Sequence, residues 1–304
     1  MENARPRATV VYLTKNGGST FLRSLELVRT QEVDFPLDVL VIDSGSTDGT
    51  IEKVEASGVR VVQVLPQEFN YGGTKNLAAR LAAGEILVFL SQDNVPSGRG
   101  WLATLLSYFT NDIDVVQGPS ISEPNGYYWW ARGGFFYTRE TRRWIREHGL
   151  GLSCCNLAIR RDVVLRVPFR EVPMSEDKVL QRDLIAAGAT IREAIDAPVY
   201  HTHFYGARDL AQRLQNEGLG WSYAGATYTV SDMLLDMVSP TMWARSIRAA
   251  LSGDIRGFHE LLFPFIRPSM IYKGLHFATA YKWEREAAIE ARSRTRDLGN
   301  KGFR

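Results

Sequence analysis

The sequence has few cysteines and no long hydrophobic run. Its two cysteines, Cys154 and Cys155, are adjacent, and neighbouring cysteines seldom form a disulfide because the geometry is strained. The pair favours a reducing cytosol, with both side chains acting as small buried hydrophobes. No stretch of about 18 apolar residues occurs, so no membrane-spanning helix is predicted. Residues 1–8 lack the apolar core of a signal peptide, and we therefore expect none.

Charge of one sign is also scarce. The 304 residues include 36 basic and 34 acidic side chains, which gives a formal net charge of +2. This balance argues against a nucleic-acid partner, because nucleic-acid binding requires a basic field. The positive excess gathers in residues 285–304, where a solvated tail and a contact with an acidic membrane surface are both open interpretations.

Three motifs that would indicate other enzymes are absent. The sequence contains no GxxxxGK[ST] phosphate loop, no GxGxxG after a strand and no HExxH. The missing GxGxxG argues against a dehydrogenase, and the missing HExxH excludes a zinc-protease helix. The nearest rival enzyme is a sugar nucleotidyltransferase, but residues 14–20 match its glycine-rich loop poorly.

The first half of the chain alternates short apolar runs with helical patterns. The expected strands are residues 9–13, 37–42, 59–64 and 86–90, and the expected helices are residues 20–30, 48–57 and 73–83. Near-continuous apolar strands joined by helices predict a parallel sheet with helices on both faces. Ligands of such sheets bind at the carboxyl ends of the strands. From residue 207 onward the pattern is helical, and Pro264 and Pro268 are expected to interrupt it.

Carboxylates follow two of the expected strands. Asp43 opens the turn DSGSTDGT, where it can accept hydrogen bonds from a base or a ribose. Ser46 or Thr47 can cap the helix that follows. Asp93 lies in SQDN after the strand ILVFL, placed to bind a hard cation that bridges phosphates. Taken alone, a turn carboxylate is the simpler interpretation of Asp93.

Three later segments carry further candidates. The segment FNYGGTKN precedes a helix whose free amides could hold a phosphate. Asp177, in SED, is either a helix-capping acid or a general base for an acceptor hydroxyl. His201 and His203, in VYHTHF, are expected to share one face of a strand and so to indicate a metal. The aromatic segment of residues 125–151 fits either packing or stacking on a sugar ring.

In this order the motifs resemble family 2 glycosyltransferases with the GT-A fold. Within that family the chain is most similar to bacterial rhamnosyltransferase-type members. The matching segments are VIDSGSTDGT, FNYGGTKN, QDNVP, SED and VYHTH, and they extend over about residues 8–205. Two residues depart from the pattern: Ser91 stands where the first acid of D-x-D usually lies, and Ser44 where many members have a second aspartate.

The resemblance implies an α/β fold of GT-A type, with a Rossmann-like, mostly parallel sheet flanked by helices and a C-terminal helical extension. It implies that residues 1–206 bind the nucleotide sugar and catalyse transfer, and that residues 207–304 form the helical region. The implied donor-binding residues are Thr14, Asn16, Asp43, Lys75, Gln92 and Asp93. Asp177, with Glu176 beside it, would be the catalytic pair, and Asp93 with His201 or His203 would hold Mg²⁺ or Mn²⁺.

These observations predict an inverting glycosyltransferase. It would move a sugar from a nucleotide-diphosphate donor, dTDP-rhamnose or a UDP-sugar, to a hydroxyl of a glycan, a lipid-linked saccharide or a small molecule. A catalytically inactive nucleotide-sugar-binding or scaffold protein is the alternative. We expect a cytoplasmic protein, and a peripheral contact of residues 258–304 with the inner face of the cell membrane is a further hypothesis. The sequence predicts no oligomeric state.

Overall fold

The computed structural model describes residues 6–121, 138–149, 151–201, 203–255 and 257–278. The chain divides into two compact units, each described here by itself. One comprises Met1–Ile121, Leu152–Glu171 and Val179–His201, and the other Ser122–Gly151, Val172–Lys178 and Thr202–Arg304. The predicted division at residue 206 remains a proposal about function. Residues 127–137 and 285–304, which carry the expected aromatic cluster and basic tail, lie outside the described residues.

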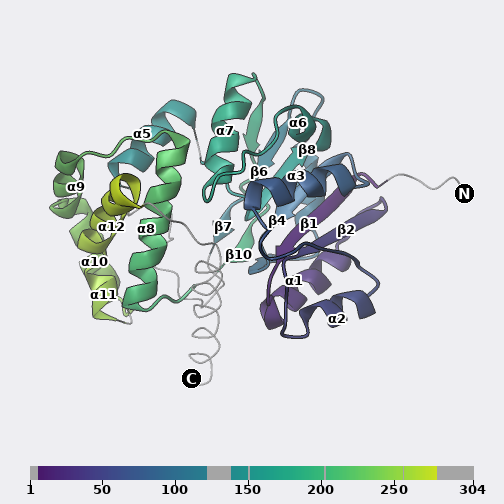
Figure 1. The fold of residues 1–304 in the computed structure, drawn as a ribbon, viewed down its shortest axis with the longest axis horizontal. Coiled ribbons are helices and arrows are strands. Elements are labelled where there is room, and N and C mark those ends of the chain that lie inside the picture. The colour runs from purple at the N-terminus through teal and green to yellow at the C-terminus, as the bar shows by residue number, and fades with distance from the viewer. Residues whose placement is uncertain (1–5, 122–137, 150, 202, 256, 279–304) are drawn as a thin grey trace, which may run out of the picture. The chain divides into compact units, whose positions relative to one another are not determined.

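The first unit is built on a seven-stranded sheet with the order β3-β2-β1-β4-β8-β6-β9 (Figure 1). Its strands are β1 (Ala8–Thr14), β2 (Leu37–Asp43), β3 (Arg60–Gln63), β4 (Ile86–Leu90), β6 (Val115–Gln117), β8 (Asn156–Arg160) and β9 (Ile191–Glu193). Strand β1 pairs in parallel with β2 and β4, and β2 with β3. Strand β8 runs antiparallel to β4 and β6. The mostly parallel sheet confirms the predicted fold class.

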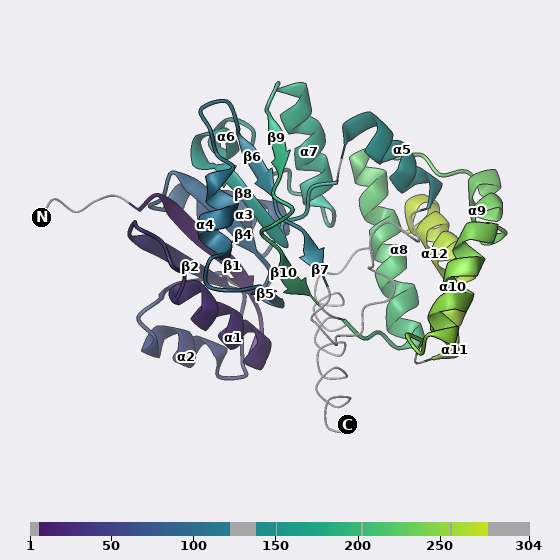
Figure 2. The same cartoon turned by 180° about the vertical axis from the view of Figure 1, so that it is seen from behind.

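Helices cover both faces of this sheet, as the apolar strands predict. Successive strand residues point to opposite faces, so Val10 and Val11 of β1 belong to different hydrophobic clusters. The helices are α1 (Gly18–Arg29), α2 (Thr50–Ala56), α3 (Tyr71–Leu81), α4 (Trp101–Ser107), α6 (Arg161–Arg166) and α7 (Glu176–Ala186). The Val10 cluster contains side chains of α1, α2 and α4, and the Val11 cluster those of α3, α6 and α7. Helix α4 accordingly lies in front of the sheet in Figure 2, which is seen from behind relative to Figure 1.

A smaller, three-stranded sheet has the order β5-β10-β7. Its strands are β5 (Asn94–Pro96), β7 (Ser120–Ile121) and β10 (Val199–His201). Strand β10 pairs antiparallel with β5 and parallel with β7. Because only three residues separate the end of β4 from the start of β5, this small sheet continues directly from the carboxyl end of a central strand.

The second unit is helical. Its helices are α5 (Arg139–His148), α8 (Ala207–Ala224), α9 (Val230–Met237), α10 (Pro240–Leu251), α11 (Phe258–Leu261) and α12 (Phe263–Phe277). The expected helical C-terminal region is therefore present as far as residue 278. Pro264 lies in the first turn of α12, where its missing N–H is not needed. The expectation that Pro268 interrupts a helix was wrong, because α12 continues through it.

Glycines bring the two longest helices of this unit close together. A Cβ added at Gly274 of α12 would lie 1.9 Å from the carbonyl oxygen of Gln215 in α8, and one at Gly218 would lie 2.2 Å from that of Ile271. Any side chain would force the backbones apart. A hydrophobic cluster that includes Leu214 fills the rest of the contact region. In the described part of the chain, every helix is too short or too polar to cross a membrane.

Candidate active site and metal centre

Three of the predicted donor-binding residues lie where β1 and β2 end. The Asp43 carboxylate is buried and accepts hydrogen bonds from the backbone N–H groups of Gly45 and Ser46, at 2.8 and 2.9 Å. The Ser46 hydroxyl also donates to Asp43. Asn16 has a positive φ of 50°, and its Oδ1 accepts from the N–H of Thr47 at 2.7 Å. The loops after β1 and β2 are thus fastened together.

The capping prediction for this turn was wrong. Helix α2 begins at Thr50, later than the expected residue 48, and its cap residue is Gly49 with a φ of 79°. The Ser46 hydroxyl bonds to Asp43 instead of a helix N-terminus, and it accepts from the Asn16 N–H at 2.8 Å. The serine therefore orders the turn at the strand ends, and the Asp48 carboxylate accepts from the first N–H of α2, that of Thr50, at 3.0 Å.

Gln92 joins the loop after β4 to the loop after β1. Its Oε1 accepts from the hydroxyl of Thr14 at 2.8 Å and from the N–H of Lys15 at 3.0 Å. This bond network was not foreseen, because Gln92 was assigned directly to the donor. The amide group holds the two strand ends at a fixed spacing, which is the arrangement that a ligand at this edge of the sheet requires.

Asp93 and His201 are brought together by the small sheet. The register of β10 against β5 places His201 opposite Asn94, so Asp93 comes next to the imidazole. The His201 Nε2 lies 3.6 Å from the Asp93 Oδ2, and the two side chains are 14% and 8% exposed. A buried carboxylate beside a partly buried imidazole offers an oxygen and a nitrogen atom as possible ligands of one cation.

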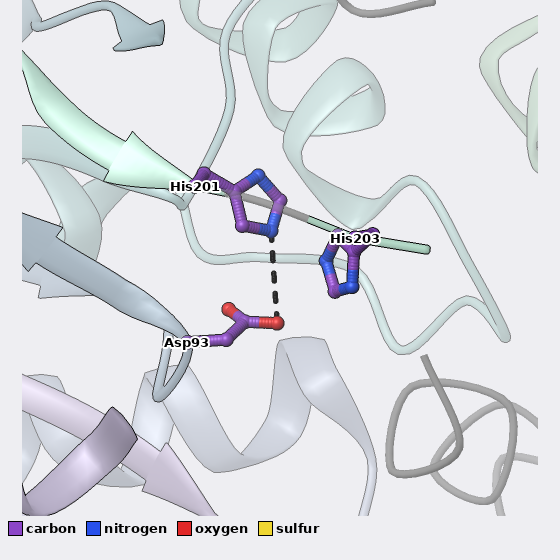
Figure 3. Close-up of side chains that lie close together, drawn as sticks. All are labelled: Asp93, His201 and His203. Carbon is purple, nitrogen blue, oxygen red and sulfur yellow. Dashed lines mark ion pairs between the residues drawn. The ribbon is translucent and has the colours of Figure 1, made fainter. Parts of the chain in front are cut away.

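His203 completes a group of three possible metal ligands (Figure 3). One ligand atom from each of Asp93, His201 and His203 lies within 4.8 Å of the others. The His203 ring is buried and stacks on Tyr205, with 5.3 Å between ring centroids. One carboxylate oxygen and two imidazole nitrogens fit Mn²⁺ well, and Mg²⁺ less well because Mg²⁺ prefers oxygen ligands. Ser91, in the position of the usual first acid, instead lies 3.5 Å from the sulfur of Cys155.

Lys75 lies in the first half of α3 and is buried. Its Nζ is 5.2 Å from the centroid of the Tyr71 ring and 5.6 Å from that of Phe169. The N-cap residue of this helix, Asn70, accepts from the N–H of Gly73 at 3.0 Å. The backbone N–H of Gly73, one of the free amides expected to bind a phosphate, is therefore already bonded to the Asn70 side chain. Gly72 is required for packing, since a Cβ there would lie 2.2 Å from the carbonyl oxygen of Arg170.

Glu176 and Asp177 begin α7, as predicted. The Asp177 Oδ1 accepts from the N–H of Lys178 at 2.8 Å, and its Oδ2 lies 3.6 Å from the Lys178 Nζ. Glu176 is buried. Ser175 has a φ of 59°, a left-handed conformation that costs a non-glycine residue free energy. A Cβ on Gly220 of α8 would lie 2.1 Å from the Ser175 hydroxyl, so only glycine leaves room for this turn.

Most of the predicted residues therefore form two groups, to which Lys75, Glu176 and Asp177 do not belong. Hydrogen bonds connect the loops that carry Thr14, Asn16, Asp43 and Gln92, and proximity groups Asp93 with both histidines. Lys75 packs on Tyr71 and Phe169, and Asp177 contacts Lys178. The sequence analysis named Ser46 only as a helix cap, missing its bonds to Asn16 and Asp43, and it did not name Phe169. The repeated hydroxyls of DSGST are the signal that could have indicated Ser46.

Two relatives and several solved structures are similar to this chain. It is 27% identical to an O-antigen chain rhamnosyltransferase (RfbN) of Salmonella typhimurium, over 70% of this chain and 72% of that protein. It is 28% identical to another (WbaN) of Salmonella anatum, over the same shares of the two proteins.

Solved structures reproduce the fold at low sequence identity. A mannosyltransferase of Pyrobaculum calidifontis, solved with GDP-Man and Mn²⁺, has a TM-score of 0.60 at 18% identity and covers 90% of this chain and 88% of its own. A glucosyl-3-phosphoglycerate synthase of Mycobacterium tuberculosis has a TM-score of 0.56 at 20% identity, covering 74% and 82%. These likenesses confirm the GT-A fold. The model of glycosyl transferase family 2 matches residues 9–167, which is more than half of the chain, and the protein therefore belongs to that family.

Proposed function

We propose that this glycosyltransferase transfers a rhamnosyl group, from a nucleoside-diphosphate donor, to a hydroxyl of a saccharide acceptor with inversion at the anomeric carbon. The observation that carries the proposal is the group of Asp93, His201 and His203 beside the ordered strand-end loops. The names of the two relatives support rhamnose as the sugar. An inactive binding protein is not favoured, since the acids of both the metal group and the α7 pair are present.

Donor recognition is proposed for the loops after β1 and β2 and for α3. Thr14, Asn16 and Asp43 would contact the base and ribose, and Gln92 would fix the loops that carry them. Lys75 would contact the diphosphate. Because the Lys75 ammonium is already held between two aromatic rings, it would meet the ligand with little further loss of conformational freedom.

Asp93, His201 and His203 are proposed to hold Mn²⁺ or Mg²⁺, with Mn²⁺ the better match for two imidazole ligands. A bound divalent cation offsets the negative charge that develops on a diphosphate leaving group. The structure of the mannosyltransferase that resembles this chain contains Mn²⁺ with its nucleotide sugar, which supports the same choice here.

Asp177 is proposed as the general base, with Glu176 as its buried neighbour. Its carboxylate would accept the proton of the acceptor hydroxyl while that oxygen forms a bond to the anomeric carbon and the bond to the diphosphate breaks. One displacement inverts the configuration. A positioned base of this kind contributes roughly 10²–10⁴-fold to the rate. The Lys178 ammonium lies 3.6 Å from the Asp177 carboxylate and helps to fix its orientation.

The acceptor and location belong to the same proposal. The relatives are named for O-antigen chains, so we propose a saccharide or lipid-linked saccharide acceptor and a cytoplasmic protein that associates peripherally with the inner face of the cell membrane. We further propose that residues 1–206 bind the nucleotide sugar and catalyse its transfer, and that residues 207–304 form a helical region.

Calorimetric binding of a nucleotide panel tests the proposal. UDP, dTDP and GDP would each be titrated with Mn²⁺, Mg²⁺ or EDTA into the wild type and Asp93→Asn, a variant of the same shape without the charge. We expect metal-dependent binding of dTDP that Asp93→Asn weakens at least tenfold, roughly 1.4 kcal/mol. Asp162→Asn, on the exposed surface of α6, is the matched control and should bind as the wild type does.

The other outcomes are equally informative. Binding that persists in EDTA would remove the metal from the proposal and leave the phosphates to Lys75. Preference for UDP or GDP would keep the transferase and replace the sugar donor. Absence of binding by every nucleotide would contradict the enzymatic proposal and restore the inactive scaffold.

A further inference from the structure

Helix α9 turns its acidic side chains toward the protein. Among its residues only Asp236 is fully buried. The Asp236 Oδ2 accepts from the backbone N–H of Arg139 at 2.8 Å and from the Tyr228 hydroxyl at 2.9 Å. Asp232, one turn earlier, forms a two-pronged pair with the Arg143 guanidinium at 2.9 and 3.2 Å. The inward face of α9 is therefore held by ion pairs and hydrogen bonds.

The side chains of Val230 and Leu234 in α9, and of its C-cap residue Val238, point the other way. Val230, Leu234 and Val238 follow one another at four-residue spacing and are 48%, 53% and 66% exposed. At 100° per residue, Leu234 lies about 200° around the helix from Asp232. A helix on a water-facing surface normally has the opposite arrangement, with its apolar stripe against the core. Helix α9 thus exposes aliphatic side chains and buries an acid, the reverse of what is normal for a helix on a water-facing surface.

Helix α10 extends this exposed apolar surface. It buries Met242 and Ser246, while Ile247 and Leu251 on its other side are 50% and 85% exposed. Phe258, the first residue of α11, is 73% exposed. Helices α9, α10 and α11 follow one another along one edge of the helical unit in both views (Figures 1 and 2). We call this surface the apolar ridge, defined as Val230, Leu234, Val238, Ile247, Leu251 and Phe258.

On α9 and α10 the outward-facing charges have one sign, whereas Asp254, between α10 and α11, is a partly buried acid. Between residues 230 and 251 the acids are Asp232 and Asp236, which face inward, and the bases are Arg245 and Arg248 on α10. Arg248 is exposed and Arg245 partly so. The outward surface of the two helices therefore combines aliphatic side chains with positive charge. That combination complements an anionic bilayer surface, where apolar groups enter the acyl boundary and arginines meet the headgroups.

We infer that the apolar ridge is the surface with which the protein docks on a membrane containing anionic phospholipids. The inference rests on the proposed peripheral association and gives it a location, on α9 to α11. Exposed aliphatic surface of this extent is unfavourable in water and is removed from water by a bilayer. Docking in the plane of the interface also agrees with the finding that no described helix could cross a membrane.

Flotation of the full chain with lipid vesicles tests the inference. Vesicles of phosphatidylcholine, with and without phosphatidylglycerol, would be mixed with the wild type and with the triple variant Leu234→Gln, Val238→Gln and Leu251→Gln. We expect the wild type to float with the anionic vesicles and the triple variant to lose at least about tenfold in partitioning. The double variant Arg245→Gln and Arg248→Gln should lose the preference for anionic over neutral vesicles.

A matched control comes from the first unit. Leu65, Leu165 and Ile195 are 53%, 49% and 71% exposed, so changing all three to glutamine removes comparable apolar surface elsewhere. This control should partition as the wild type does. An unchanged melting temperature verifies that each variant is folded.

The outcomes separate this inference from the proposed function. The inference would be overturned if the wild type did not bind vesicles, or if the triple variant of the ridge bound them as strongly as the wild type does. A wild-type dimer that the ridge variant converts to a monomer in sedimentation would overturn it in favour of a second copy as the occupant. Nucleotide binding by calorimetry should be the same in the wild type and the ridge variant. If neither protein bound a nucleotide, the proposed function would be contradicted, but the vesicle result would still test the membrane surface.

Discussion

Gln92 illustrates how one side chain orders a binding edge. Its Oε1 is shared by the Thr14 hydroxyl and the Lys15 N–H, so it fixes the loops after β1 and β4 relative to each other. A hydrogen bond of this kind contributes about 0.5–1.5 kcal/mol, and an orphaned buried partner costs about 1–3 kcal/mol. The residue is therefore expected to act through loop position as well as through any contact with the donor.

Removing this side chain should weaken nucleotide binding. We expect Gln92→Ala to lower the affinity about tenfold and Thr14→Val to lower it less, because the valine removes one of two hydrogen bonds. Since both changes delete the same bond, the double variant should be weaker by less than the sum of the single effects. Calorimetry measures the nucleotide affinity of the two single variants and the double variant, with the exposed Gln67→Ala as control. Strictly additive losses would contradict a functional hydrogen bond between Thr14 and Gln92.

Glu140 gives the helical unit a pH-dependent stability. Burial raises the pKa of its carboxyl from 4.5 to about 7, although the hydrogen bond from Thr138 and the charge of Arg267 act in the opposite direction. Between these pKa values the folded protein holds a proton that the unfolded chain has released. The contribution of Glu140 to the free energy of unfolding should therefore be largest below pH 4.5. It should fall by on the order of 3 kcal/mol as the pH rises to 7.

The isosteric variant Glu140→Gln should abolish this dependence. An amide carries no charge at any of these pH values, so the variant should unfold at a higher temperature than the wild type at pH 8 and lose the downward slope between pH 5 and pH 7. Thermal unfolding across that range, with the exposed Glu147→Gln as control, provides the measurement. A slope that survives in Glu140→Gln would assign it to another group.

At the scale of elements, the contact between α8 and α12 depends on glycine. The added Cβ of Gly274→Ala would lie 1.9 Å from a backbone oxygen, which cannot move without displacing a helix. We expect this variant to lose about 1–3 kcal/mol of stability, the usual range for overpacking. Gly98→Ala is the control, because a Cβ there meets no atom within 4 Å. Urea unfolding compares them, and equal midpoints would show that the helices can separate without cost.

Sequence reasoning worked best for elements whose position is determined by their own residues. The strands β1, β2 and β4 were predicted to within two residues because each is a continuous apolar run ended by polar residues. Strand β8, which runs antiparallel to β4, was not among the expected strands. Pro268 also misled, because proline in a helix is tolerated where the surrounding packing holds the helix together.

The candidate site was predictable for the same reason, but only in part. Asp93 and His201 could be singled out because strand ends meet at one edge of a sheet, and the register of β5 with β10 then brings them to 3.6 Å. The bonds of Ser46 and Gln92 depend on how three loops fold back on one another, which no single stretch of sequence encodes. The outward face of α9 was equally hidden, because periodicity reveals an apolar stripe but not what covers it.

At the scale of the whole molecule, donor binding should stabilise the unit that carries the strand-end loops. A ligand at about 100 times its Kd stabilises the folded form by about 2.7 kcal/mol, which corresponds to roughly 100-fold slower exchange of amides that exchange through unfolding. Hydrogen exchange with and without dTDP and Mn²⁺ should therefore show this slowing in peptides of β1 and β4. Peptides of α12 serve as the internal reference. Protection of equal size in α12 would mean that both units unfold as one, and that the helical unit also responds to the donor.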